Sequence, residues 1–344
     1  MARVLVGMSG GVDSSVAAAL LLEQGHAVVG ATMKLWGGTS DSGCCSVADV
    51  EDARRVAQQL GIAHHVFNFT EDFDRHVVDP YVAAHAVGRT PNPCVECNRH
   101  LKFDRFLQRA EQLGFDAVAT GHHARVVPVG DRWELRRGAD AAKDQSYVLS
   151  MLTQRELASV RLPVGDMDKA EVRRRAAATG LRTADKPDSQ DVCFILATDG
   201  GRTTFLGDRI PLHPGRVVDT SGAEVGRVDA VELVTVGQRR GITGGGRERR
   251  YAISVDTATA TVVAGTDDEL QTRNLVVSDL TWTDQPSSDG DEVLVQTSAH
   301  GSPMGATFAA GGTLHFVEPQ RLVAPGQTVA LYAGDRVLGA GIAV

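Results

Sequence analysis

The sequence predicts an α/β protein in which a doubly wound parallel-sheet domain is followed by two small β-rich domains, the last of them barrel-like. Over roughly the first 125 residues, short apolar runs alternate with amphipathic helical patterns, which is typical of a parallel sheet with helices on both faces. After residue 200, glycine and valine become frequent, helical periodicity fades, and short strands separated by turns follow, as in small barrels or sandwiches. We therefore expect domains at residues 1–200, 201–267 and 268–344.

The first half of the chain shows its elements in order. Residues 4–6 form a short apolar run that predicts the first strand, and apolar residues at helical spacing over 12–21 predict the helix after it. A second helix is expected at 46–61, because Ser46 and Asp49 stand at capping-box spacing. The remaining expected elements are strands at 27–36, 63–69 and 116–121, a helix around 98–113 and further helix within 151–180.

Composition limits the class of protein. The chain of 344 residues is 42% hydrophobic and 23% charged, values typical of a globular protein. The sequence shows no basic-then-apolar N-terminal signal and no apolar stretch of membrane-spanning length, so we expect a cytoplasmic protein with no membrane partner. The five cysteines are few, odd in number and unevenly spaced, which argues against a secreted disulfide framework.

The distribution of charge along the sequence is compatible with a polyanionic partner. The formal net charge of −8 argues weakly against nucleic acid, but local basic patches decide affinity for phosphate. Each arginine group alone is typical of a solvated surface, whereas three groups around one nucleotide site favour a polyanion. The groups are Arg173, Arg174 and Arg175 in a helical pattern, Arg239 and Arg240, and Arg247, Arg249 and Arg250 after a glycine run.

The turn after the first strand carries the clearest chemical signal. In VGMSGGVDSSVAAAL (6–20), glycines and serines lie between a strand and a helix, where backbone N–H groups at the positive end of the helix dipole suit phosphate. The P-loop of kinase-like NTPases needs a lysine in this turn, and none is present. Asp13 in the first helical turn indicates Mg²⁺ that arrives with a nucleotide. Ligands in such sheets bind at the carboxyl ends of strands, near Ser9, Met33 and Gly121.

A C-x-x-C pair predicts redox, metal or sulfur chemistry. Cys94 and Cys97 lie in GRTPNPCVECNRHLKF (88–103), a loop that is expected to enter a helix near Asn98. Cys97 would then lie close to a helix N-terminus, where the dipole lowers a thiol pKa and favours the thiolate. Zinc would need two more ligands at comparable spacing, and no second C-x-x-C supplies them.

The other cysteines are less informative alone. Cys193 follows a polar loop in KPDSQDVCFI (186–195), where a buried structural cysteine and a second reactive thiol are both consistent with the pattern. Cys44 and Cys45 fit no chemical role, and we expect a packing or loop role for them.

Several motifs together resemble one family. The turn resembles the PP-loop (SGGxDS) of the ATP pyrophosphatase superfamily, which grips the pyrophosphate of ATP while AMP is transferred. The other motifs are RTPNPCVECN, ATGHHAR (119–125), KDQSYVL (143–149), DSQDVCFI (188–195), TVGQRRG (235–241) and EPQRLVAPGQTVALY (318–332). In this order and spacing they make the chain similar, over essentially its full length, to the bacterial tRNA-specific 2-thiouridylase family (the MnmA family).

The resemblance implies roles for residues by their position. Cys97 matches the nucleophile, and Cys193 matches the residue that carries a persulfide. The implied nucleotide-binding residues are Gly7, Met8, Ser9, Gly10, Gly11, Val12, Asp13 and Ser14, with Met33 at the nucleobase, Gly121 at the ribose or adenine, and Asp13 also at Mg²⁺. The implied tRNA-binding residues are Asn92, Pro93 and Cys94 beside the target base, together with His122, Lys143, Asp144, Gln145, Ser298, Ala299 and Gln327. The chain departs from some relatives at Ser298 and Ala299, where these carry arginine and tyrosine, and at Cys94, where these carry a proposed acid–base aspartate.

The implied reaction uses ATP and Mg²⁺ and has two macromolecular partners, a tRNA and a sulfur-donor protein. ATP adenylates O2 of the wobble uridine (position 34) in the anticodon loop of a tRNA, a single-stranded loop from which a base can be unstacked at low cost. A sulfur-donor protein loads Cys193 as a persulfide. Sulfur then replaces the activated oxygen, and a Cys97–Cys193 disulfide remains for reduction.

Three alternatives stay open from the sequence. An amide-forming synthetase of the same superfamily would also adenylate a substrate but has no use for a spaced cysteine pair. Cys94, Cys97 and Cys193 could instead hold three irons of a [4Fe–4S] cluster that binds sulfide. A nucleotide-sensing RNA-binding module is the non-enzyme alternative, and two cysteines beside an ATP loop argue against it.

Overall fold

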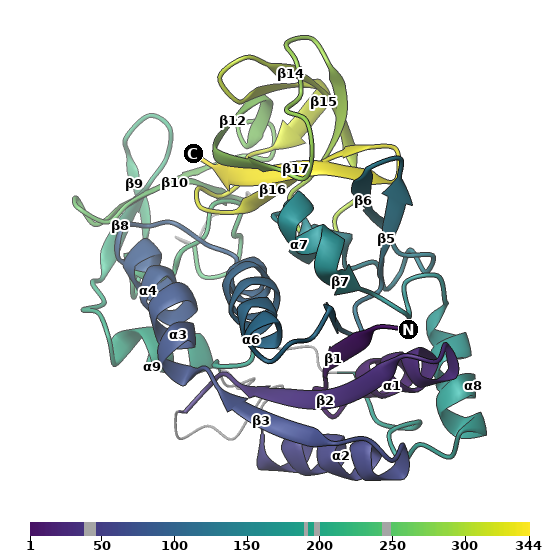
Figure 1. The fold of residues 1–344 in the computed structure, drawn as a ribbon. Coiled ribbons are helices and arrows are strands. Elements are labelled where there is room, and N and C mark those ends of the chain that lie inside the picture. The colour runs from purple at the N-terminus through teal and green to yellow at the C-terminus, as the bar shows by residue number, and fades with distance from the viewer. Residues whose placement is uncertain (38–45, 189–191, 196–199, 243–248) are drawn as a thin grey trace.

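The computed structural model describes residues 1–37, 46–188, 192–195, 200–242 and 249–344, and in this part of the chain the strands form three sheets. Figure 1 shows the parallel sheet in the lower part of the molecule, the central strands β8–β10 at the left and the C-terminal strands at the top. Within the described residues, no helix is both long and apolar enough to span a bilayer.

The first sheet has the predicted doubly wound architecture. Its parallel strands run in the order β3-β2-β1-β4-β7, so the chain starts in the middle and winds outward in both directions. Successive side chains of a strand point to opposite faces, and accordingly Val4 and Val6 pack with helices α1, α2 and α8, whereas Leu5 packs with α6. The strands are β1 (Arg3–Gly7), β2 (Ala27–Lys34), β3 (His64–Asn68), β4 (Ala117–Ala119) and β7 (Val160–Arg161).

The helices cover both faces of this sheet, as α2 and α6 do in Figure 1. Helix α2 begins as the sequence predicts, since Ser46 Oγ accepts a hydrogen bond from the Asp49 N–H at 3.1 Å. The helices are α1 (Val12–Glu23), α2 (Val47–Gln59), α3 (Thr70–Phe73), the π-helix η1 (Asp74–Val78), α4 (Asp79–Ala86), α5 (Pro93–Glu96), the π-helix η2 (Cys97–Arg105), α6 (Phe106–Gln112), the 3₁₀ helix η3 (Ser146–Leu149), α7 (Gln154–Ser159), α8 (Lys169–Ala178), α9 (Gly201–Gly207) and the 3₁₀ helix η4 (Val231–Leu233).

Two features of this region were not expected. The segment 151–180 is divided into α7 and α8 by β7, a short strand at the edge of the parallel sheet. A hairpin of β5 (Ala124–Val129) and β6 (Arg132–Arg137) leaves the parallel sheet and joins the C-terminal sheet, where Arg136 pairs with Arg336 of β17. The N-terminal half of the chain therefore contributes strands to the C-terminal sheet.

The central β-rich unit packs on helix α4. Its sheet has the order β10-β11-β8-β9, with β8 (Gly215–Val218), β9 (Glu224–Val228), β10 (Tyr251–Asp256) and β11 (Thr261–Gly265) around a small apolar core. His85 of α4 is 2% exposed, and its Nδ1 lies 3.2 Å from the Glu232 carbonyl oxygen. The buried histidine thus joins the N-terminal domain to this unit.

The C-terminal strands form the predicted barrel. They run in the order β12-β15-β14-β13-β16-β17, and pairing of β12 with β17 closes the ring. Closure leaves no unpaired edge within the ring. The strands are β12 (Gln271–Trp282), β13 (Glu292–Gln296), β14 (Met304–Ala309), β15 (Thr313–Arg321), β16 (Thr328–Ala333) and β17 (Arg336–Ala343).

The barrel docks on two motif segments of the N-terminal domain. Thr90 donates its N–H to the Pro325 carbonyl at 2.7 Å and accepts from Gln327 Nε2 at 2.9 Å. Tyr147 donates its hydroxyl to the Thr328 carbonyl at 2.9 Å. The barrel is therefore anchored to the chain on both sides of the C-x-x-C helix.

Candidate active site

The phosphate loop between β1 and α1 is shaped for an anion. The N-terminal cap of α1, Gly11, has no side chain to bond the first N–H groups of the helix, and residues 11–14 line a cavity in which an anion could accept from these groups. Gly10 has φ +73°, and a Cβ there would lie 2.3 Å from the Asp49 carbonyl oxygen. Ser14 Oγ accepts from the Ser9 N–H at 3.2 Å and donates to the Gly11 carbonyl at 3.1 Å, which braces the turn.

The neighbouring strand ends complete this side of the site. A Cβ on Gly121 would lie 2.4 Å from the Ser14 nitrogen, so only glycine lets the segment after β4 pass the first turn of α1. A Cβ on Gly7 would lie 3.3 Å from Met33 Cε, which places the methionine beside the loop. The prediction that Ser9, Met33 and Gly121 each lie at or near the carboxyl end of a strand is confirmed by the bounds of β1, β2 and β4.

Asp13 is the centre of a charged network. Lys169 Nζ lies 2.8 and 2.7 Å from its two carboxylate oxygens, and His123 Nε2 lies 3.1 Å from Oδ1. Burial raises the pKa of Asp13, but the hydrogen bonds from His123 and Lys169 outweigh this effect, and the pKa falls below its ordinary value. Asp13 is therefore an ionised carboxylate at neutral pH, the form that a divalent cation requires.

Asp188 carries the second carboxylate of the network. It forms ion pairs with Lys143 at 2.8 Å, Lys169 at 2.8 Å and Arg173 at 3.2 Å. Burial raises the pKa of Asp188, but the hydrogen bonds from Lys143 and Lys169 outweigh this effect and lower the pKa from its ordinary value to about 2. One lysine ammonium, that of Lys169, is consequently shared between the phosphate loop and the segment that leads to Cys193.

The cysteines lie on the other side of the site, and the helix that holds two of them starts earlier than predicted. Asn92 Oδ1 accepts from the N–H groups of Cys94 and Val95 at 3.1 and 3.3 Å, so α5 begins at Pro93 and runs on through η2 and α6. The prediction of a start near Asn98 is wrong because proline is well suited to the first helical position. Cys94 therefore lies in the first turn and Cys97 one turn further in, where the helix dipole acts more weakly.

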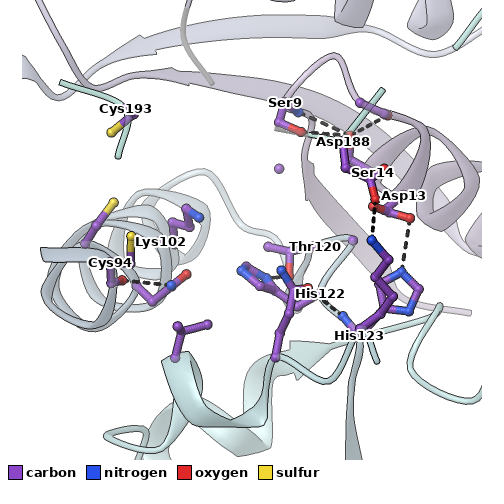
Figure 2. Close-up of a pocket in the computed structure, with 18 of the residues that line it drawn as sticks. Ser9, Asp13, Ser14, Cys94, Lys102, Thr120, His122, His123, Asp188 and Cys193 are labelled. Atoms are coloured by element: carbon purple, nitrogen blue, oxygen red, sulfur yellow. Dashed lines mark hydrogen bonds and ion pairs between the residues drawn. The ribbon is translucent and has the colours of Figure 1, made fainter. Parts of the chain in front are cut away.

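The three thiols differ in exposure. Cys94 is exposed, Cys97 is buried at 7% exposure, and Cys193 is half-buried. Figure 2 shows Cys94 and Cys193 on one side of the pocket and Asp13 on the other. Cys44 and Cys45 lie outside the described residues.

A single cavity of about 560 Å³ joins the phosphate loop to the cysteines. This volume is in the range of small-molecule and cofactor sites. The residues predicted from sequence that line it are Gly7, Met8, Ser9, Gly11, Val12, Asp13, Ser14, Met33, Pro93, Cys94, Cys97, Gly121, His122, Lys143, Asp144, Gln145, Cys193 and Ala299. The sequence segments named for ATP and for sulfur chemistry thus meet at one site.

Four predicted residues, Gly10, Asn92, Ser298 and Gln327, do not line this cavity. Gly10 packs against α2, and Asn92 caps α5. Gln327 binds the Thr90 carbonyl, and the Ser298 carbonyl accepts from Gln296 Nε2 at 2.9 Å. In this structure these four residues make contacts within the protein itself.

Several residues predicted to contact tRNA are engaged inside the protein. Asp144 accepts from Arg137 at 2.9 Å and from the Gly138 N–H at 2.9 Å. Gln145 Oε1 accepts from the His123 N–H at 2.9 Å. His122 is buried, its Nδ1 lies 2.7 Å from Thr120 Oγ1, and burial lowers its pKa well below the ordinary value, so the ring is neutral.

The arginine group on α8 is not an open basic patch. Arg173 donates to the carbonyls of Ala184 and Lys186 as well as to Asp188. Arg174 and Arg175 both pair with Glu171. Arg239, Arg240 and Arg249 are exposed, Arg250 pairs with Asp219 at 3.8 Å, and Arg247 lies outside the described residues.

Sequence reasoning missed several charged or polar residues of the cavity, among them Lys102, His123, Lys169, Lys186 and Asp188. His123 lies inside the ATGHHAR motif, next to the predicted His122. Lys169 carries no local signal, because it is the first residue of a helix with no motif of its own. Lys186 pairs with Asp49 and Asp52 of α2, both at 2.7 Å.

The described residues give the iron–sulfur alternative no support. Across the described part of the chain, no group of three His, Cys, Asp or Glu side chains is arranged to hold a metal ion. The single carboxylate of Asp13 does fit Mg²⁺, which takes one or two carboxylates together with substrate phosphates and waters.

The chain matches three family models in sequence order. Residues 2–197 match one described as a tRNA methyl transferase HUP domain, residues 203–266 one described as a tRNA methyl transferase PRC-barrel domain, and residues 272–343 one described as an aminomethyltransferase beta-barrel domain. The descriptions name methyl transfer, whereas the similar full-length proteins are named for thiolation.

Similar proteins over the whole length are called tRNA-specific 2-thiouridylase MnmA. The one from Chloroflexus aurantiacus J-10-fl is 48% identical over 353 residues, covering 99% of this chain and 98% of its own. The protein from Acidothermus cellulolyticus is 47% identical, and the match covers 98% of this chain and 96% of that protein. The protein from Chloroflexus aggregans is 46% identical, and the match covers 99% of this chain and 98% of that protein.

Proposed function

This chain belongs to the tRNA-specific 2-thiouridylase family, and we propose that its cavity is the active site in which ATP activates a tRNA uridine and a cysteine-borne sulfur replaces O2. The protein is a tRNA-uridine 2-sulfurtransferase, and the reaction forms 2-thiouridine in tRNA. The observation that carries the site assignment is the single cavity lined by the phosphate loop, Cys97 and Cys193.

The first step is adenylation. The loop N–H groups at the start of α1 would bind phosphate oxygens of ATP, with Asp13 directed at Mg²⁺ and Met33 at the base. Bound Mg²⁺ supplies positive charge to the phosphates. O2 of the uridine attacks the α-phosphorus, the α–β bond breaks, and pyrophosphate leaves. The carbon C2 then carries AMP as its leaving group.

The second step transfers sulfur. A sulfur-donor protein loads Cys193 as a persulfide, whose terminal sulfur attacks C2 and displaces AMP. Cys97 attacks the Cys193 sulfur, which leaves the transferred sulfur on the base; attack before transfer would release it as hydrosulfide instead. Either order ends with a Cys97–Cys193 disulfide, and an external dithiol must supply two electrons for the next cycle.

Exposure supports this division of roles. Cys193 is half-buried and accessible to a donor, whereas Cys97 is buried in the cavity wall. An amide-forming synthetase would have no need of two thiols in the cavity that receives the nucleotide. We place the substrate uridine at position 34 of the anticodon loop, with Asn92, Pro93 and Cys94 beside it, and the reaction in the cytoplasm.

The test is mass analysis of tRNA nucleosides from cells that lack this protein. We expect 2-thiouridine derivatives at the wobble position to disappear and to return when the wild-type gene is supplied. A Cys193→Ser gene should not restore them. Unchanged 2-thiouridine in the deletion strain would contradict the proposed function.

A further inference from the structure

Two side-chain routes connect Asp13 to one short segment, residues 143–145. This segment follows the β5–β6 hairpin and lies on the cavity wall. Asp13 is at the start of α1, far from it in sequence. Figure 2 shows Asp13 between Asp188 and His123, the residues through which the two routes pass.

The first route is rigid. Gln145 donates its backbone N–H to the His123 carbonyl and accepts the His123 N–H on Oε1, both at 2.9 Å. His123 is 3% exposed, and its Nε2 lies 3.1 Å from Asp13 Oδ1. This route holds one carboxylate oxygen of Asp13 in a fixed position.

The second route is a row of alternating charges. Lys143 pairs with Asp188 at 2.8 Å, Asp188 with Lys169 at 2.8 Å, and Lys169 with Asp13 at 2.7 Å. The outermost member, Lys143, is 37% exposed in its side chain, whereas Lys169 is 13% exposed. A ligand from solvent can therefore reach the row at Lys143, while its inner end lies at the phosphate loop.

The row responds to an anion at its outer end. An RNA phosphate that pairs with Lys143 withdraws positive charge from Asp188, which keeps the more distant Arg173 at 3.2 Å and Lys169 at 2.8 Å. The under-compensated Asp188 carboxylate then attracts Lys169 more strongly, and Lys169 shifts its ammonium away from Asp13. Asp13 is left with His123 and with a carboxylate oxygen available to nucleotide-bound Mg²⁺.

We propose that Lys143, Asp188 and Lys169 couple tRNA binding to nucleotide binding: a tRNA phosphate at Lys143 releases Asp13 from Lys169 and so raises the affinity for Mg²⁺·ATP. This inference rests on the proposed function, since it requires tRNA at this site. Thermodynamic reciprocity then makes Mg²⁺·ATP tighten tRNA binding by the same factor. The consequence is that ATP is engaged for cleavage mainly when its acceptor is present.

The test measures binding of the α,β-methylene analogue of ATP, with Mg²⁺, by calorimetry. This analogue lacks the bond that the reaction breaks, so affinity is measured without turnover. For the wild-type chain, we expect saturating tRNA to lower the analogue's Kd by about 5- to 10-fold, the lower part of the usual range of coupling. Without Mg²⁺, this effect should disappear.

Two variants are expected to differ in their affinity for the analogue: one raises it without tRNA, and the other leaves it low. Lys143→Met removes the outer cation permanently, so without tRNA it should bind the analogue about as tightly as the tRNA-bound wild-type chain, and tRNA should add nothing. Asp188→Asn removes the competitor for Lys169, so Lys169 stays on Asp13, the affinity remains low, and tRNA does not change it. Lys143→Arg keeps the charge and should retain coupling.

The exposed Lys34 at the end of β2 supplies a matched control, because Lys34→Met removes a lysine charge outside the cavity and should behave as the wild-type chain. Thermal unfolding confirms that each variant is folded. Equal Kd values with and without tRNA in the wild-type chain would overturn the coupling, as would weaker binding of the analogue by Lys143→Met. Formation of 2-thiouridine by the same wild-type preparation is measured separately, so failure of the coupling is distinguished from failure of the proposed function.

Discussion

Lys169 forms ion pairs of 2.7 Å with Asp13 and 2.8 Å with Asp188, so one ammonium group joins the phosphate loop to the chain segment that precedes Cys193. The lysine that a P-loop would carry within its turn comes here from the start of α8. In this position it neutralises carboxylates rather than lying in the loop itself.

Asp13→Asn should lower ATP–pyrophosphate exchange in the presence of tRNA by at least about 100-fold, as expected when a group that places charge at the transition state is lost. The amide keeps the size of the side chain but loses the anion that Lys169 and Mg²⁺ require. Asp166→Asn removes an exposed carboxylate outside the cavity and serves as control. Exchange near the wild-type rate in Asp13→Asn would refute the assignment of Asp13.

The two cysteine variants should separate adenylation from sulfur transfer. Cys193→Ser should still release pyrophosphate with tRNA but acquire no labelled sulfur from a donor. Cys97→Ser should adenylate and accept a persulfide on Cys193, and then stall. Mass spectrometry of each loaded variant locates the sulfur, and a persulfide on Cys97 of the Cys193→Ser protein would reverse the two roles.

Gly121→Ala should weaken ATP binding by about 10-fold or more, because the added methyl group would lie 2.4 Å from the Ser14 nitrogen and displace the first turn of α1. Calorimetric titration of the α,β-methylene analogue measures the change. Gly37→Ala is the matched control, since among the described residues its methyl group would meet only the Thr70 side chain, at 3.6 and 4.0 Å. Equal affinities in the two variants would contradict the close approach at Gly121.

Acid should weaken the contact between α4 and the central unit. Burial lowers the pKa of His85 to about 4, whereas the unfolded chain takes up a proton near the ordinary value of 6.5. The folded pKa is depressed, so the stability contributed by neutral His85 is complete above pH 6.5 and falls as the pH drops toward 4. At about 1.4 kcal/mol for each unit of pKa, the loss is at most about 3 kcal/mol.

The free energy of unfolding, measured at several pH values in urea, checks this prediction. Replacement of the imidazole in His85→Gln should flatten the pH dependence between 6.5 and 4 relative to the wild-type chain. His315→Gln, which changes an exposed histidine of the barrel, should leave the slope unchanged. A wild-type slope that persists in His85→Gln would show that another group titrates in this range.

Local patterns in the sequence were enough to predict the elements that build the phosphate site. Residues 4–6 and 12–21 form β1 and α1 as expected, because apolar periodicity and the glycine-rich turn act over a few neighbouring residues. The cap at Ser46 and the change to β structure after residue 200 follow from equally local preferences. The resemblance of the motifs to those of the 2-thiouridylase family indicated which segments bind ATP and which hold the reactive cysteines.

Only the tertiary structure decided which side chains meet. The partners of Asp13 are His123, 110 residues away, and Lys169, 156 residues away, and no periodicity connects positions so distant in sequence. The β5–β6 hairpin joins a sheet formed from the other end of the chain for the same reason. Secondary structure responds to neighbouring residues, whereas ion pairs and sheet partners depend on which surfaces the folded chain brings within a few ångströms. The network around Asp13 therefore belongs to the fold and could not have been found in the sequence.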